Sequence, residues 1–180
     1  MTTKNTLSSK KNFLTAIGAV ASVAILLFLF SPSSGGGPQV GSHAPSFSLT
    51  DLGGRTANLS DYRGKVVLLD FWATWCVTCE QELPELKSLH SEFKDNGFSL
   101  LAIACDDGGP EIVANFAAKN QLPYLVLFAD DETKNDYRIF GLPTKFLLDA
   151  DGKIFRKYLA NTSRDEIAAD IKTLLKGKAS

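Results

Sequence analysis

The sequence has only three cysteines, only two histidines and no surplus of basic residues. Three cysteines cannot form a disulfide-stapled scaffold, and they do not provide the paired ligand motifs of a structural zinc site. Lys4, Lys10 and Lys11 are the only charged residues before Asp51, so the rest of the chain holds 16 of the 19 basic residues against all 20 acidic ones. The remaining charge of −4 leaves no basic surface, which argues against nucleic acid as a partner.

The cysteines that are present indicate redox chemistry. Cys76 and Cys79 form one C-x-x-C motif and Cys105 is left over, in a chain whose 180 residues fit one domain and a short appendage. A metal site is the alternative for this pair. It would need further ligands, and Cys105, His43 and His90 do not stand at ligand spacing. We therefore predict no metal, and we assign the two histidines no role.

The appendage is the apolar segment 13–30, FLTAIGAVASVAILLFLF, which contains no charged residue. As a helix it would be about 27 Å long, close to the thickness of the hydrocarbon layer of a bilayer. Lysines precede the segment and no basic residue follows it until Arg55. The positive-inside rule then predicts a cytoplasmic tail at 1–12, a transmembrane signal anchor at 13–30 and a domain on the outer, periplasmic side of the cytoplasmic membrane.

Removal of this segment as a secretory signal peptide is the alternative, because both kinds of segment begin with positive charge. The apolar run is longer than a usual signal core, and the SPSSGGG that follows offers no clean cleavage site. Residues 31–40 are rich in serine, glycine and proline and predict a flexible linker to a folded domain at 41–180.

The central motif of the domain is VVLLDFWATWCVTCEQELPELKSL, residues 66–89. It predicts a buried strand at 66–72, a short turn, and an amphipathic helix whose first turn carries Cys76 and Cys79. A thiol at a helix N-terminus lies near the positive end of the macrodipole and near unpaired N–H groups, which favour the thiolate. Cys76 is therefore the candidate nucleophile. Cys79 lies on the same helical face, in position to close a disulfide and displace a partner bound to Cys76.

The rest of the domain alternates between strand and helix patterns. A small N-terminal β-hairpin is predicted around the turn 51–54. Further strands are expected at 98–104, 124–128, 144–148 and 153–158, and helices at 110–119 and 163–175. Ser163 and Glu166 are spaced as a capping box for the last helix. This order predicts an α/β fold with a central mixed sheet covered by helices on both faces.

The motif also resembles a known family. W-C-x-x-C after an apolar strand, with Pro84 five residues beyond the second cysteine, is similar to thioredoxin. The longer pattern FWATWCxxCxxExP, with an apolar segment before it and GLPT far after it, resembles the membrane-tethered TlpA/ResA-like thiol-disulfide oxidoreductases over about residues 41–176. The resemblance implies a thioredoxin-like fold with an added N-terminal β-element, a redox-active disulfide between Cys76 and Cys79, and no bound cofactor.

Two carboxylates accompany the cysteines. Asp70 interrupts the apolar strand, where an unpaired charge costs several kcal/mol, so its pKa should be raised. The resemblance to thioredoxin implies that Asp70 is the general base for Cys79; an idle carboxyl group at the strand end is the alternative. Glu82 follows Cys79 by three residues and by resemblance lies beside the cysteines, although a solvated helix surface is also ordinary for glutamate. A carboxylate there raises the pKa of a cysteine and favours a reductant.

The remaining candidate residues concern substrates. By resemblance, Pro143 in Leu142-Pro143-Thr144 is cis and faces the active-site cysteine, leaving the backbone before it free to pair with an extended client; a trans turn proline is the alternative. Trp75 is predicted to be a partly exposed contact for protein substrates. Cys105 is expected to behave as a small buried hydrophobe, with a third thiol near the pair as the alternative.

The sequence thus predicts an enzyme, a thiol-disulfide oxidoreductase that reduces disulfides in extracytoplasmic client proteins. The resemblance implies a membrane electron donor and clients in cytochrome c or copper-site maturation. A disulfide oxidase would use the same two sulfurs in reverse. A thiol peroxidase would want a lone cysteine in a P-x-x-x-T-x-x-C context, and a copper-delivery module would need C-x-x-x-C with a distant histidine; the chain has neither pattern.

Overall fold

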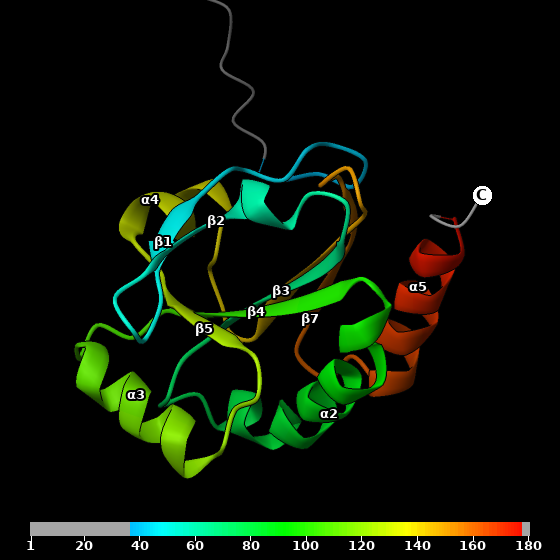
Figure 1. Cartoon of the computed structure of the whole chain (residues 1–180). Helices are drawn as coiled ribbons and strands as arrows, with labels where there is room; N and C mark the ends of the chain where they lie inside the picture. The colour runs from blue at the N-terminus through cyan, green and yellow to red at the C-terminus, as the bar shows by residue number, and fades with distance from the viewer. Residues whose placement is uncertain (1–36, 178–180) are drawn as a thin grey trace, which may run out of the picture. The chain divides into compact units, whose positions relative to one another are not determined.

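The predicted apolar strand 66–72 is the central strand of a five-stranded mixed sheet (Figure 1). The structure is a computed structural model that describes residues 37–177. Strand β3 (Val66–Trp72) is buried at all seven positions, and the sheet order is β5-β4-β3-β6-β7. β3 runs parallel to β4 (Phe98–Ala104) and antiparallel to β6 (Thr144–Leu148). β5 (Leu125–Phe128) and β7 (Ile154–Leu159) form the two edges.

The two faces of the sheet bury separate cores, because side chains alternate along each strand. On β3, Val66, Leu68 and Trp72 pack on one face, while Val67 and Leu69 pack on the other. Helices α2 (Val77–Phe93), α3 (Pro110–Lys119) and α5 (Arg164–Gly177) cover the first face. Asp70 lies between Leu68 and Trp72 in the alternation along β3, so its side chain points to the same face, toward these three helices.

The second face is covered by the N-terminal hairpin and by helix α4 (Asp131–Asp136) (Figure 1). Strands β1 (Ser48–Thr50) and β2 (Thr56–Asn58) pair antiparallel and lead into the short helix η1 (Leu59–Tyr62). The hairpin turn is closed by Asp51, whose carboxylate accepts hydrogen bonds from the backbone N–H groups of Gly53 and Arg55. The added N-terminal β-element is therefore present.

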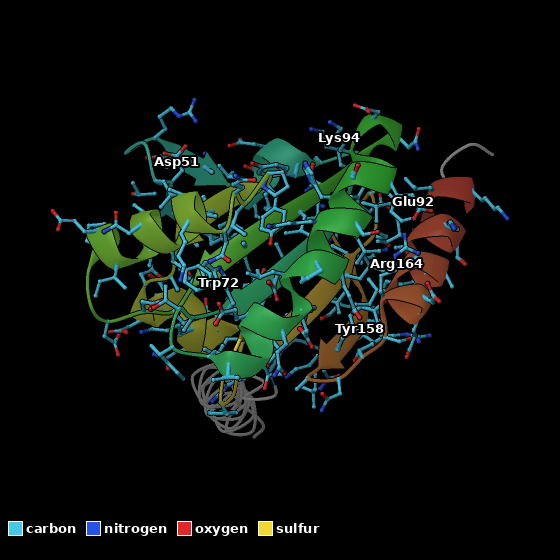
Figure 2. The ribbon with its side chains drawn as sticks, turned by 90° about the horizontal axis from the view of Figure 1, so that it is seen from below. Asp51, Trp72, Glu92, Lys94, Tyr158 and Arg164 are labelled. Carbon is cyan, nitrogen blue, oxygen red and sulfur yellow. A yellow bond between two sulfur atoms is a disulfide. The ribbon has the colours of Figure 1, made fainter. Side chains whose placement is uncertain are left out.

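Helix α2 follows β3 after a loop at 73–76 and lies beside α5 (Figure 2). Pro84 lies inside the helix. The helix continues into the short helix η2 (Lys94–Asn96), which ends at Gly97. Gly97 has a φ of 82°, in the left-handed region that glycine tolerates best. Glu92 on α2 forms ion pairs with Arg164 and Lys172 on α5. These contacts fix the orientation of the helix whose other end carries the cysteines.

Most predicted boundaries match the structure. The strands at 66–72, 98–104 and 144–148 and the helix at 110–119 are confirmed at both ends. β5 begins one residue later than predicted, β7 is shifted by one residue, and α5 runs two residues further. One of the two hydrogen bonds of the predicted capping box of α5 is present: Ser163 Oγ accepts the Glu166 N–H at 3.3 Å. The Glu166 carboxylate accepts instead from Arg156.

The predictions for the cytoplasmic tail, the transmembrane anchor and the first part of the linker, residues 1–36, lie outside the described residues. No helix within 37–177 has the length and apolar content needed to cross a bilayer. From Gly41, whose N–H donates to the carbonyl of Ile154 at 2.7 Å, the chain is joined to the sheet.

Candidate functional site: a disulfide at the N-terminus of α2

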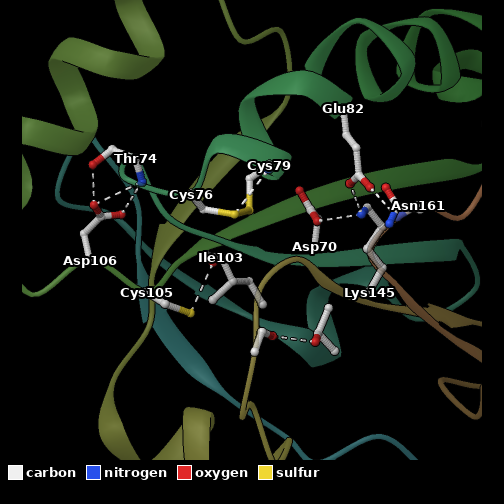
Figure 3. Close-up of a disulfide and its surroundings, with 12 residues drawn as sticks. Asp70, Thr74, Cys76, Cys79, Glu82, Ile103, Cys105, Asp106, Lys145 and Asn161 are labelled. Carbon is white, nitrogen blue, oxygen red and sulfur yellow. Dashed lines mark hydrogen bonds and ion pairs between the residues drawn. A yellow bond between two sulfur atoms is a disulfide. The ribbon is translucent and has the colours of Figure 1, made fainter.

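Cys76 and Cys79 form a disulfide at the junction of β3 and α2 (Figure 3). Their sulfur atoms are 2.11 Å apart and their Cα atoms 5.2 Å apart. Cys76 is not in the first helical turn, as predicted, but one residue earlier, where it is the N-cap of a helix that begins at Val77. Its Sγ accepts the N–H of Cys79 at 3.2 Å. The sulfur of Cys76 therefore occupies the place of an N-cap oxygen, where helix N–H groups stabilise negative charge.

The loop before Cys76 is held by a residue that the sequence analysis missed. The Asp106 carboxylate accepts hydrogen bonds from the backbone N–H of Thr74, at 3.1 Å, and from its hydroxyl group. Asp106 reaches this loop because β3 and β4 are parallel and end at the same edge of the sheet. The sequence did contain an indication of this role, because Asp106 is an acid two residues after the end of the predicted strand 98–104. With this loop fixed, Trp75 projects outward and is 69% exposed, as predicted.

Asp70 lies on the same face of β3 as the cysteine-bearing helix and is 3% exposed. Figure 3 shows its carboxyl group between the disulfide and Lys145. Burial raises the pKa of Asp70 from 3.8 to about 6, while the nearby Lys145 ammonium lowers that pKa and the Glu82 carboxylate raises it. The predicted burial of this acid and the predicted direction of its pKa are both seen in the structure.

Lys145 was not expected at the site. It lies directly opposite Asp70 in the antiparallel pairing of β3 with β6, and it is only 2% exposed. Its Nζ is 3.7 Å from Oδ1 of Asp70 and donates a hydrogen bond to Oε2 of Glu82. The other oxygen of Glu82 accepts the backbone N–H of Asn161 at 3.3 Å. Glu82 thus faces the site, as the resemblance implied, but its direct partners are Lys145 and Asn161.

The Leu142–Pro143 peptide bond is cis, as the resemblance implied. Thr144 begins β6, is buried, and donates its hydroxyl hydrogen to the carbonyl of Gly141 at 2.7 Å. This segment forms part of a groove of about 440 Å³. The groove is lined by Arg138, Phe140, Gly141, Leu142, Pro143, Thr144, Lys157, Leu159 and Ala160. Phe140, at 89% exposed, and Leu159, at 60%, are large apolar side chains that the fold leaves in solvent.

Cys105 forms no disulfide and donates its thiol hydrogen to the carbonyl of Ile103 at 3.7 Å. Burial raises the pKa of this thiol to about 12. Cys105 is half-buried, rather than buried as was expected. A thiol that stays protonated is a poor nucleophile, so the raised pKa favours an inert role over that of a third redox thiol. Among residues 37–177, no group of three or more His, Cys, Asp or Glu side chains is arranged to hold a metal ion.

Proteins similar to this chain include thiol-disulfide oxidoreductases and a thioredoxin-like protein. Residues 40–157 match the AhpC/TSA family. The chain is 38% identical over 132 residues to the thiol-disulfide oxidoreductase ResA of Bacillus cereus, covering 72% of this chain and 75% of that protein. It is 34% identical over 133 residues to the thioredoxin-like protein YneN of Bacillus subtilis, covering 73% of this chain and 78% of that protein.

Solved structures with similar folds belong to the same group of proteins. The thioredoxin domain of a Bacteroides vulgatus thiol-disulfide oxidoreductase matches with a TM-score of 0.70 and 28% identity, over 76% of this chain and 98% of that one. A thioredoxin-family thiol:disulfide interchange protein from Chlorobium tepidum matches with a TM-score of 0.69 and 25% identity, over 78% of this chain and 99% of that one. The chain therefore belongs to the thioredoxin-like AhpC/TSA family and is a thiol-disulfide oxidoreductase similar to ResA.

Proposed function

We propose that this protein is a membrane-anchored, extracytoplasmic enzyme that reduces disulfides in client proteins. The observation that carries the proposal is the placement of Cys76 as the N-cap of α2, with the buried carboxyl group of Asp70 on the α2 face of the neighbouring strand. The helix N-terminus stabilises the attacking thiolate of Cys76. The acids next to the site favour protonated thiols over thiolates, and so favour a pair that gives up its electrons to form a disulfide.

The first step is attack of the Cys76 thiolate on one sulfur of the client disulfide. The client S–S bond breaks, a mixed disulfide forms between Cys76 and the client, and the leaving client sulfur takes up a proton. Because Sγ of Cys76 accepts a helix N–H, the thiolate is held in a fixed place before attack.

The second step releases the client. Cys79 transfers its thiol proton to the Asp70 carboxylate, and the resulting thiolate attacks Sγ of Cys76. The Cys76–Cys79 disulfide forms, the mixed disulfide breaks, and the second client sulfur leaves and is protonated. The client gains two electrons and two protons in all. With a pKa of about 6, Asp70 is largely ionised at pH 7 and ready to accept the proton, which it then passes to solvent or to the client.

Clients are bound by the surface around Trp75 and by the groove next to the cis-proline segment. An extended client strand pairs with the backbone before Pro143, and Leu142 and Thr144 hold that segment in place. The exposed rings and aliphatic side chains of Trp75, Phe140 and Leu159 then contact apolar side chains of the client. A partly unfolded protein offers such side chains, and this supports client proteins over small disulfides as substrates.

The charge pattern of the N-terminal segment supports the location. An uncleaved anchor at 13–30 would hold the domain on the periplasmic side of the cytoplasmic membrane, and signal cleavage would instead release it as a secreted protein. The oxidised enzyme then needs a membrane electron donor with a dithiol that reduces Cys76–Cys79 again. Apocytochrome c and copper-site assembly factors are clients whose thiols must be kept reduced for maturation.

The test is equilibration of the full-length chain, in detergent, with glutathione buffers of defined potential. We expect a reducing potential, close to that of thioredoxin at about −270 mV. A value near that of strong periplasmic oxidants, about −120 mV, would overturn the reductase and support a disulfide oxidase. In parallel, Cys76→Ser should abolish reduction of insulin disulfides, whereas Cys105→Ser, the matched control, should leave the rate unchanged.

A further inference from the structure

The geometry points to Lys145 as a positioning residue for thiol-disulfide exchange. Its ammonium group, shared between Asp70 and Glu82, holds both acids beside the cysteine-bearing helix and sets how readily Asp70 accepts the proton of Cys79. The inference rests on the proposed role of Asp70 as proton acceptor. Lys145 itself touches neither sulfur in any contact that the structure shows, so it acts through the two acids.

The strand register places Lys145 next to Asp70. The two residues are directly opposite in the pairing of β3 with β6, and on β6 the side chain of Leu147, two residues on, packs on the face that α2 covers. By the two-residue period of a strand, Lys145 points to that same face. Asp70 and Lys145 are each no more than 3% exposed. A lysine buried this deeply is costly unless it is paired, so this contact is a specific feature of the fold.

The second acid joins the strand pair to the helix. Glu82 lies on α2 one turn after Cys79, and its carboxylate accepts from both the Lys145 ammonium and the Asn161 N–H. Lys145 therefore connects the strand that carries Asp70 with the helix that carries Cys79 (Figure 3). Loss of the ammonium would leave two carboxylates facing each other with no cation between them.

The charges around Asp70 act in opposite directions. The positive charge of Lys145, from β6, lowers the pKa of Asp70, and the negative charge of Glu82, from α2, raises it. Burial is the main cause of the raised pKa of the Cys105 thiol, beyond β4, and of the Tyr124 phenol, before β5, and the negative charge of Asp70 adds to both shifts. Oδ1 of Asp70 is buried and accepts no hydrogen bond within the described residues, so it is available to a proton. Lys145 is the only one of these neighbours with a positive charge.

Two substitutions at the two ends of the bridge test the inference. Lys145→Met removes the cation with little change in volume, so the pKa of Asp70 should rise by about one or more. Glu82→Gln removes the competing anion, so the same pKa should fall. The pKa would be followed by carbon NMR of the side-chain carboxyl groups in the full-length oxidised chain in detergent, with Asp70→Asn identifying the signal. A merely structural role would not move the pKa in opposite directions.

The kinetic readout is the rate at which the mixed disulfide is resolved. At pH 6 the fraction of ionised Asp70 should fall from about one half to about one tenth in Lys145→Met, which predicts about a fivefold slower step. Lys65→Met is the control, because Lys65 is an exposed lysine at the opposite end of β3 and should change neither value.

Two outcomes would overturn the inference: an Asp70 pKa that moves in the same direction in both variants, or one that moves in neither. Should Lys145→Met fail to fold, Lys145→Gln removes the same charge but keeps a polar end for Glu82, and it should raise the pKa of Asp70 in the same direction. The proposed function fails separately, if Cys76→Ser keeps its activity. That result would leave the NMR titration of Asp70 unaffected.

Discussion

Replacing Asp70 with asparagine should remove a loss of stability that sets in as the pH rises, and it should slow the exchange reaction. Asp70 is buried, and its pKa is about 6 in the folded protein against an ordinary value of 3.8. A folded pKa above the unfolded one means that the folded protein binds this proton more tightly than the unfolded chain does. Protonation therefore stabilises the fold at low pH, and this stabilisation is lost as the pH rises through the folded pKa.

The size of the effect follows from these two values. Between pH 5 and pH 7.5 the folded state gives up its proton while the unfolded state has already lost it, so titration of this one group lowers the free energy of unfolding by about 1 kcal/mol. Asparagine cannot titrate. From pH 5 to pH 7.5 the unfolding free energy of Asp70→Asn should therefore gain about 1 kcal/mol relative to that of the wild type.

The assay is urea unfolding of the oxidised full-length chain in detergent, carried out at both pH values. The quantity compared is the unfolding free energy of the variant minus that of the wild type, at pH 5 and at pH 7.5. The cost of leaving Lys145 without its partner is the same at both pH values, so it cancels in this comparison. Asp151→Asn is the matched control, because Asp151 is an exposed aspartate in a turn. A stability difference between Asp70→Asn and the wild type that stays constant with pH would refute the assignment of a raised pKa to Asp70.

Three further predictions concern the loop, the third thiol and the groove. Asp106→Ala should free the Thr74 loop and slow attack on client disulfides, by about tenfold, while circular dichroism shows an unchanged fold; an unchanged rate would contradict a positioning role for Asp106. Cys105 should resist iodoacetamide at pH 8 in the folded protein, as mass mapping of the labelled peptides would reveal, because its pKa is about 12; rapid labelling would refute its inert role. Phe140→Ser should raise KM for a protein client several-fold but leave the rate with a small aromatic disulfide unchanged, and an equal loss on both substrates would remove the groove from client binding.

Local pattern was sufficient for the main elements of this fold. β3 and β4 are apolar runs bounded by glycines or turns, and Pro110 marks the start of α3, so their limits could be read directly. Helix α4 escaped prediction because six residues, Asp131–Asp136, are too few to establish a period. Its start depends on the Asp130 side chain, which accepts the N–H of Thr133 at 2.7 Å.

The candidate site was predictable where its residues are close in sequence and unpredictable where strands bring them together. Cys79 and Glu82 stand within helix α2 and Cys76 is its N-cap, so the three could be related by the helical period. Lys145 lies 75 positions after Asp70, and only the register of β3 with β6 places the two side by side. An isolated lysine in an apolar strand was the available signal, equivalent to the isolated Asp70, but a sequence does not state which strands are neighbours.

The cis-proline segment has a consequence for anyone who wishes to redesign this enzyme. Five consecutive residues, 141–145, contribute to the groove wall at one end and supply the buried cation at the other. Mutations that retarget the enzyme to new polypeptides by reshaping this wall will also disturb the acid–base chemistry beneath the sulfurs. Changes of selectivity at residues 141–145 therefore also change reactivity. A library that varies the groove residues of the neighbouring strand and its end, Leu159 and Ala160, offers the better chance of changing one without the other.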